Sequence, residues 1–223
     1  DEKLSPRFGV VIKPASAISL YASYTESFLP QAGDQFFLLS PGDAAFEPEK
    51  FTNYEIGAKW APNASLLVSG AVFQLERTNT KGPDPTNPTL TALVGESRTE
   101  GFEFNVVGTI TPNWRANIGY TYLDGEVRSK AAFGPAGQRL QQLPKHQITA
   151  WTRYDFTSRF GAGFGAVYQD EQFTSFSNAV TLPDYLRVDA ALFYEVSDTV
   201  ALQVNVENLF DADYFPSAHG DNN

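Results

Sequence analysis

The chain has 223 residues, of which 42% are hydrophobic and 14% aromatic, and its formal net charge is −10. This charge argues against nucleic acid as a partner, and the absence of cysteine excludes disulfides, thiolate metal sites and a cysteine nucleophile. No run of about 18 apolar residues occurs, which excludes a transmembrane helix, whereas a membrane-barrel strand needs only about 9–11 alternating residues. Because the sequence contains no methionine and shows no signal peptide, we expect an internal piece of a longer protein.

Alternating segments joined by short turns run through the chain, with little helical periodicity. They predict about ten β-strands, at residues 7–13, 17–27, 51–61, 64–79, 94–110, 113–124, 145–156, 159–172, 183–196 and 199–210. Short turns are predicted around 14–15, 62–63, 112–113, 157–158 and 197–198, and long polar loops over 28–50, 80–93, 125–144 and 173–182. Short turns at one end and long loops at the other are typical of outer-membrane barrels, in which the short turns are periplasmic.

The predicted strands have one apolar and one polar face. In "NWRANIGYTYLD" (113–124), Trp114, Ile118 and Tyr120 alternate with polar residues such as Arg115 and Asn117. Aromatic residues cluster toward the strand ends, as they do at the two interfaces of a membrane. A soluble β-sandwich is the alternative, but it would have to accommodate charged residues in the middle of its strands. The pattern therefore favours an all-β transmembrane antiparallel barrel.

Catalytic motifs are sparse. "GAGFGAVYQ" (161–169) places three glycines at a spacing of two, which predicts one face of a strand rather than a phosphate-binding loop. No Gly-x-Ser-x-Gly nucleophile motif occurs, and the two histidines, His146 and His219, are far apart in the sequence. We therefore predict no enzymatic activity, no catalytic residues, no cofactor and no protein metal site.

Six ordered blocks together resemble the TonB-dependent outer-membrane receptors. "VNVENLFDADYFPS" (204–217) resembles their penultimate-strand signature, and "LPDYLRVDAALFYEVSDTVAL" (182–202) is similar to the strand pair before it. The others are "SLYASYTESFLP" (19–30), "FEPEKFTNYEIGAKW" (46–60), "SRTEGFEFNVVGTITPNWRANIGYTYLDGEV" (97–127) and "LPKHQITAWTRYDF" (143–156). The resemblance covers nearly the whole chain, and its "YFPSAHGDNN" ending is most similar to the catecholate-siderophore branch.

The resemblance implies that residues 1–223 are the C-terminal portion of a 22-stranded barrel, without the plug domain and the last strand. It further implies TonB-energised uptake of a ferric siderophore across the bacterial outer membrane. The implied partners are the ferric siderophore, outer-membrane lipid, the protein's own plug domain, and the TonB–ExbB–ExbD complex through a region N-terminal to this chain. Iron would enter only as the chelated cargo.

Binding a large anionic ferric complex requires aromatic surface and positive charge in the outer loops and upper lumen. The candidate ligand-binding residues are Arg77, Lys81, Arg98, Arg128, Arg139, Phe36, Phe37, Phe133, Phe173 and Phe176. The alternative for each cation is a solvated loop charge, or an ion pair in the lumen with Glu96, Glu100, Glu126 or Asp124.

A second set of residues belongs to the family motifs and is expected to shape strands and the rim. Its members are Tyr54, Glu55, Gly57, Gly101, Glu103, Asp189, Asn205, Asn208, Leu209, Phe210, Asp211 and Tyr214. In the last motif, we expect Asn205 in the lumen, a polar turn from Asn208, and Leu209, Phe210 and Tyr214 at the membrane interface.

Other functions remain open on the sequence alone. A passive porin of ten strands would share the alternation, as would a receptor for haem, cobalamin or carbohydrate. An outer-membrane barrel enzyme would need a cluster of catalytic residues at the outer rim. A soluble β-sandwich binding module is the alternative outside the membrane class.

Overall fold

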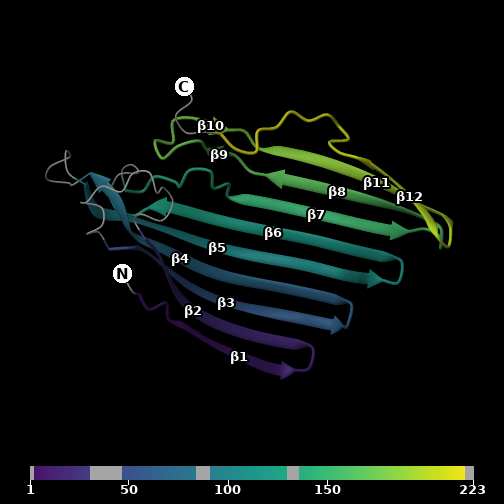
Figure 1. Ribbon diagram of the computed structural model, residues 1–223, viewed down its shortest axis with the longest axis horizontal. Helices are drawn as coiled ribbons and strands as arrows, with labels where there is room; N and C mark the ends of the chain where they lie inside the picture. Colours follow the sequence, from purple (N-terminus) through teal and green to yellow (C-terminus); the bar gives the residue numbers. More distant parts are fainter. Residues whose placement is uncertain (1–2, 31–46, 84–90, 130–135, 219–223) are drawn as a thin grey trace.

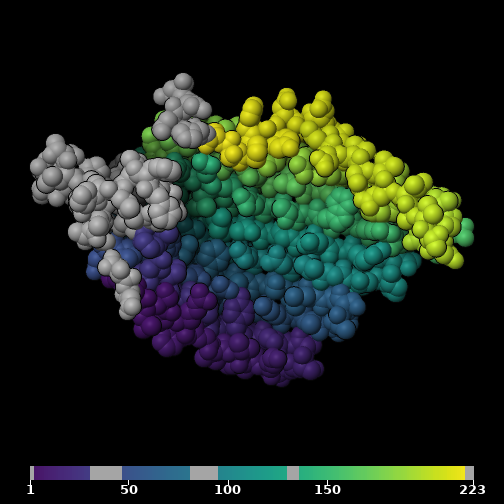
Figure 2. All heavy atoms as spheres, in the orientation of Figure 1, coloured from purple at the N-terminus to yellow at the C-terminus, as the bar shows by residue number. Residues whose placement is uncertain are grey.

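The computed structural model describes residues 3–30, 47–83, 91–129 and 136–218, and within 81–94 it describes only the backbone of the strands. Ten strands form one antiparallel sheet in which sequence neighbours are spatial neighbours (Figures 1 and 2). They are β1 (Arg7–Ala15), β2 (Ile18–Leu29), β3 (Glu49–Asn63), β4 (Leu66–Pro83), β5 (Thr91–Thr111), β6 (Trp114–Val127), β7 (His146–Asp155), β8 (Phe160–Gln169), β11 (Tyr185–Ser197) and β12 (Val200–Val206). A small separate hairpin pairs β9 (Gln172–Phe173) with β10 (Thr181–Leu182). None of the described residues forms a helix that could cross a membrane.

The predicted strands are confirmed, with shifts of one to three residues at most ends and three larger differences. Strands β4 and β5 extend to Pro83 and from Thr91, so the connection predicted at 80–93 is shorter. The loop predicted at 173–182 contains most of the β9–β10 hairpin. The last strand ends at Val206 rather than at 210, because Asn208 has a φ of 52°, which an extended strand does not allow.

The connections separate into two kinds at the two ends of the sheet. Two-residue turns at 16–17, 64–65, 112–113 and 198–199 join strand pairs at the right-hand end of Figure 1, and 156–159 joins β7 to β8 there. The described parts of the long connections, with the β9–β10 hairpin, lie at the opposite end. This asymmetry agrees with the predicted arrangement of short turns and long loops.

Residues paired across neighbouring strands share a face, so the register separates two surfaces. One row joins Ala22, Ile56, Val72, Phe102 and Tyr122 across β2 to β6. The neighbouring row on the other surface joins Tyr21, Gly57, Ala71, Glu103 and Thr121. We call the surface of Ile56 the outer face and the surface of Gly57 the inner face.

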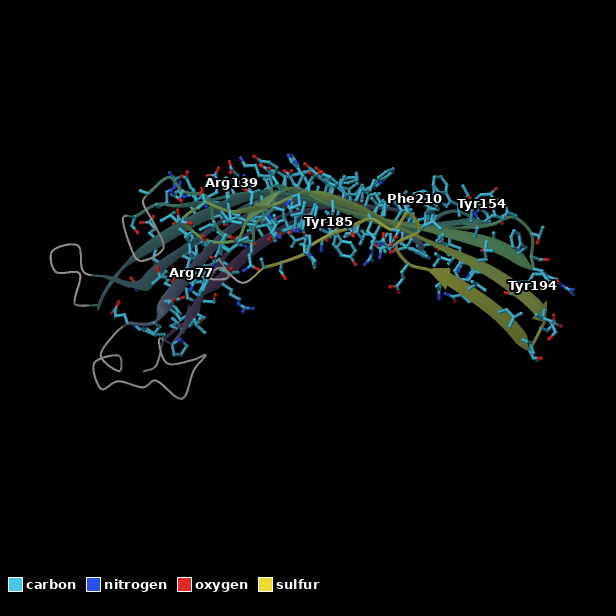
Figure 3. All side chains as sticks on the ribbon, turned by 90° about the horizontal axis from the view of Figure 1, so that it is seen from above. Arg77, Arg139, Tyr154, Tyr185, Tyr194 and Phe210 are labelled. Atoms are coloured by element: carbon cyan, nitrogen blue, oxygen red, sulfur yellow. The ribbon has the colours of Figure 1, made fainter. Side chains whose placement is uncertain are left out.

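The sheet is curved, and the inner face is its concave side. Figure 3 shows the sheet as an arch, with Tyr185 beneath it. Tyr185 belongs to the inner face, because its register joins it through Gln169 and Gln147 to Thr121. The polar surface therefore faces the inside of the curve, and the apolar surface faces outward, as in the wall of a membrane barrel.

The two edge strands, β1 and β12, have no second partner among the described residues. Their unpaired N–H and C=O groups cannot be left in hydrocarbon. We therefore expect a polypeptide of only residues 1–223 to aggregate in detergent, whereas a longer protein that supplies the missing strands should fold. Heat-modifiable migration in SDS gels measures this difference. A monomeric, heat-modifiable 1–223 polypeptide would contradict the prediction.

Candidate functional site

The outer face carries an apolar band between two groups of aromatic residues. The group near the loop end contains Tyr24, Tyr54, Tyr120, Tyr122 and His146, and the Tyr120 hydroxyl lies 2.9 Å from His146 Nδ1. The group near the short turns contains Trp60, Trp114, Tyr154, Phe160 and Tyr194. Tyr54 and Trp60 are six residues apart in β3, about 20 Å in an extended strand. This arrangement matches the aromatic girdles of a membrane barrel.

Beyond the aromatic group near the loop end, the outer face becomes charged. Lys50 pairs with Glu26 at 2.7 Å, and Arg98 pairs with Glu76 at 2.7 Å. These pairs lie beyond the apolar band, toward the loops. Hydrogen bonds from Lys50 and Tyr24 hold the pKa of Glu26 below its ordinary value, so this carboxylate stays ionised.

Arg98 and Arg128 belong to this charged outer surface. Arg98 shares the outer face with Phe102, four residues along β5, and pairs with Glu76. Arg128 pairs with Glu126 at 2.6 Å, and Glu126 lies opposite Arg98 in the register. The structure therefore places neither Arg98 nor Glu126 in the lumen.

Several family-motif residues line the inner face. Glu55 accepts a hydrogen bond from the Tyr21 hydroxyl, and Gly57 and Glu103 lie in the same row of the register as Tyr21. A Cβ on Gly57 would lie 2.5 Å from the Tyr21 ring. The motif glycine thus allows an aromatic ring to lie flat across the strand, which explains this residue type at this position.

A pocket of about 330 Å³ opens on the inner face near the loop end. Strands β3 to β5 and the connections after β6 and β9 contribute to it. Its lining residues, which we call the upper lumen pocket, are Phe51, Leu75, Arg77, Ser97, Thr99, Leu140, Gln141 and Phe176. The pocket thus combines aromatic surface with one guanidinium group.

Arg77 is held in place at this pocket. Its Nη2 lies 2.6 Å from Glu49, and its guanidinium lies 5.5 Å from the centroid of the Phe51 ring. The Arg77 side chain is still 39% exposed, so it remains accessible to a ligand. The ion pair orients the guanidinium but also neutralises part of its charge.

Arg139 is next to the pocket residue Leu140 only in the chain. It forms a β-bridge opposite Glu126 and so lies on the outer face with Arg98, whereas its neighbour Leu140 lies on the inner face with Thr99.

The guanidinium of Arg139 lies 5.2 Å from the centroid of the Phe173 ring. The backbone of Arg139 bonds to Asn178 in both directions, at 3.0 Å each, which joins the connection after β6 to the one after β9. Within the described parts of the chain, no carboxylate forms an ion pair with the Arg139 guanidinium. Figure 3 shows Arg77 and Arg139 at the same end of the sheet but apart.

The predicted ligand-binding residues are therefore only partly brought together. Arg77 and Phe176 share the upper lumen pocket, and Arg139 and Phe173 lie in the adjoining connections. Phe36, Phe37 and Phe133 lie outside the described residues, as does the side chain of Lys81. Sequence reasoning missed Phe51, although its alternation with Asn53 and Glu55 places it on the inner face. No comparable signal identifies Leu140 or Gln141, because they lie outside the strands.

The C-terminal motif folds against β11 on the inner face. Asp189 accepts a hydrogen bond from the backbone N–H of Asn208 at 2.9 Å and pairs with Arg187 at 3.0 Å. The Asn208 side chain bonds to both backbone groups of Ala212, which confirms the predicted polar turn. The expectation for Tyr214 was wrong. Its ring stacks on Tyr185 with centroids 4.9 Å apart, on the concave side of the sheet rather than at the membrane interface.

The three glycines of β8 lie on one face of the strand, as predicted; this is the inner face, and Gly163 and Gly165 lie beneath the Trp151 ring. A Cβ on Gly165 would lie 2.7 Å from the Trp151 ring and 3.4 Å from Asp189 Cβ. Gly165→Val should therefore destabilise the full-length protein by about 1–3 kcal/mol through overpacking. The measurement is the midpoint temperature of heat-modifiable migration.

Gly70→Val is the matched control, because a Cβ on Gly70 of β4 would lie 3.4 Å from Glu103 O and 3.9 Å from the Phe102 and Phe104 rings, which is ordinary van der Waals contact. Equal midpoints for the two variants would contradict the prediction.

Comparisons with known proteins agree with this geometry. The family model described as "TonB dependent receptor-like, beta-barrel" matches residues 1–209. The chain is 34% identical over 227 residues to the probable TonB-dependent siderophore receptor PiuA of Acinetobacter baumannii, covering 95% of this chain and 30% of PiuA. It is also 32% identical to the metal-pseudopaline receptor CntO of Pseudomonas aeruginosa, covering 96% of this chain and 30% of CntO.

Solved structures are similar over the same extent. The closed form of the ferric-catecholate import receptor Fiu from Escherichia coli K12 superposes with a TM-score of 0.86 at 29% identity, covering 96% of this chain and 32% of Fiu. The structure of PiuA superposes with a TM-score of 0.85 at 34% identity, covering 97% of this chain and 33% of PiuA. The chain thus spans about a third of the length of these receptors. It belongs to the TonB-dependent receptor family and forms part of the family's β-barrel in the bacterial outer membrane.

Proposed function

We propose that the protein containing this chain takes up a ferric siderophore of the catecholate type across the outer membrane. Two similar proteins support the ligand class, since PiuA is a probable siderophore receptor and Fiu imports ferric catecholates. The observation that carries the proposal is the upper lumen pocket, which lies on the inner face at the loop end. A ligand arriving from outside would meet this pocket before the rest of the lumen.

The chemistry of the pocket suits such a ligand. A ferric catecholate complex already encloses its iron in oxygen ligands and presents aromatic rings with negative charge. Phe51 and Phe176 would provide ring contacts, and Arg77 would provide charge-assisted hydrogen bonds. No protein ligand to the iron is needed, because the metal travels as chelated cargo. The protein would thus act as a transporter and not as an enzyme.

Transport needs energy and a movable barrier. Membership of the family implies that the protein's own plug domain closes the lumen and that the TonB–ExbB–ExbD complex supplies the energy. The inner-face carboxylates Glu55 and Glu103 are positions where the barrel could hold such a domain.

A transport experiment tests the proposal. Cells lacking their other siderophore receptors would express the full-length protein, and uptake of radioactive iron would be measured with and without a functional TonB. We expect uptake of ferric catecholate only when both proteins are present. Uptake that does not depend on TonB would favour a passive porin instead.

A second candidate follows from one relative. CntO is a metal-pseudopaline receptor at 32% identity, so a different chelated metal is an alternative cargo. The same cells distinguish the two, because a metal-pseudopaline receptor would accumulate that complex and leave ferric catecholate outside.

A further inference from the structure

A short segment, residues 137–140, continues the sheet beside the end of β6, where β7 does not reach. Gln138 C=O accepts a hydrogen bond from the β6 backbone at 2.8 Å, and Leu140 N–H donates one to the β6 backbone at 2.9 Å. Arg139, between them, lies opposite Glu126. In an antiparallel pair of this kind, the N–H and C=O of the central residue point away from the neighbouring strand. The peptide groups of Arg139 therefore form an edge that needs partners.

The carboxamide of Asn178 supplies both partners. Arg139 N–H donates to Asn178 Oδ1 at 3.0 Å, and Asn178 Nδ2 donates to Arg139 C=O at 3.0 Å. A carboxamide carries an acceptor and donors as a peptide group does, so it takes the place of a further strand at this edge. Asn178 belongs to the connection after β9, 39 residues further along the chain. One side chain thus joins the connection after β6 to the connection after β9.

Asn178 also closes the turn that carries Phe176. Its backbone N–H donates to Ser175 C=O at 3.1 Å, and its φ of 54° lies in the left-handed region, which asparagine adopts more readily than most residues. Around this turn, Thr174 N–H donates to Val180 C=O at 3.0 Å. Phe176 is therefore two residues away from the point at which its loop is attached to the other connection.

These contacts bear on the upper lumen pocket, because its lining comes from two sources. Strands β3 to β5 supply Phe51, Leu75, Arg77, Ser97 and Thr99, and the two connections supply Leu140, Gln141 and Phe176. The residues from the strands are fixed by the sheet. Those from the connections keep their places only while the connections stay joined.

We propose that Asn178 is a positioning residue for ligand binding, whose carboxamide holds Phe176 in register with Leu140 and Gln141. The inference rests on the proposed function, because it concerns the same pocket. Asn178 does not line the pocket and acts through the residues that do. Without the carboxamide, binding would have to order the two connections at a cost in conformational entropy.

Asn178→Gly tests this proposal in the full-length protein folded in detergent. Glycine keeps the left-handed backbone and removes only the carboxamide. Fluorescence titration should show a Kd for ferric catecholate that is higher by about fivefold. Hydrogen exchange, measured by mass spectrometry, should become faster for the amides of 137–142. The midpoint temperature of heat-modifiable migration should not change, because the bonds lie outside the long strands of the sheet.

Asn208→Gly is the matched control. Asn208 has a φ of 52°, and its carboxamide bonds to Ala212 N–H at 2.9 Å and Ala212 C=O at 3.0 Å, so the chemistry is the same. These bonds stay within one turn after β12, and Asn208 is not among the residues that line the pocket. Its Kd and the exchange of 137–142 should equal those of the wild type.

The outcomes separate the two proposals. Equal Kd values for the wild type and Asn178→Gly would overturn the positioning role and leave the proposed function standing. Unchanged exchange of 137–142 in Asn178→Gly would also overturn it, because the carboxamide would then not hold the connections together. A wild type that binds no ferric catecholate would contradict the proposed function itself, and the positioning role with it.

Discussion

Asp189→Ala should destabilise the full-length receptor by about 3 kcal/mol, more than a single truncation within the C-terminal motif that Asp189 contacts. The Asp189 carboxylate holds both the backbone N–H of Asn208 and the Arg187 guanidinium, and its side chain is only 17% exposed. Removing it would leave a half-buried guanidinium without its counter-charge. The same change would release the segment that follows β12 from β11.

The midpoint temperature of heat-modifiable migration measures this effect. Asp213→Ala is the control, because Asp213 is exposed and has no ion pair within the part of the chain that the structure describes. Its midpoint should equal that of the wild type. If the Asp189→Ala midpoint were also unchanged, the contacts with Asn208 and Arg187 would not stabilise this end of the barrel.

Arg77→Ala should weaken the binding of ferric catecholate by about tenfold. Loss of one charge-assisted hydrogen bond costs about 1.5–3 kcal/mol, and each 1.4 kcal/mol is about tenfold in affinity. The lower figure applies because Glu49 already neutralises part of the charge of Arg77, which lines the upper lumen pocket with its side chain 39% exposed. Arg139→Ala should have a smaller effect, because Arg139 lies opposite Glu126 on the outer face.

Arg98→Ala provides the matched control for this prediction. Arg98 is also a loop-end arginine, but it lies on the outer face in a pair with Glu76. We expect its Kd for ferric catecholate to equal that of the wild type. A larger loss of affinity for Arg98→Ala than for Arg77→Ala would contradict the assignment of inner and outer faces. Fluorescence titration of the detergent-folded variants measures both constants.

Much of the fold could be predicted from alternation alone, because a strand with two unlike faces requires a regular spacing of two. The faces of 113–124 and 51–61 are as expected, and so is the inner row of glycines in β8. Strand ends were less accurate. A positive φ at Asn208 ends the last strand, and alternation does not reveal a backbone conformation of that kind.

The site was harder to predict, because its residues come from separate connections. Arg98 and Arg77 are similar loop-end arginines in the sequence, but they lie on opposite faces. Each is an even number of residues from a phenylalanine of its own strand, Arg98 from Phe102 on the outer face of β5 and Arg77 from Phe73 on the inner face of β4, and that count would have separated them. No such count places Arg139, Phe173 or Phe176, because contacts between two connections position them.

Binding of a ferric siderophore of the catecholate type by the full-length protein decides whether the proposed ligand is right. The most direct measurement is a tryptophan-fluorescence titration of the protein folded in detergent, with ferric catecholate, ferric hydroxamate, haem and cobalamin as separate ligands. We predict submicromolar quenching by ferric catecholate and no saturable response to the other three. Saturable binding of one of the others, with no response to ferric catecholate, would contradict the proposed ligand and leave the outer-membrane barrel unchanged.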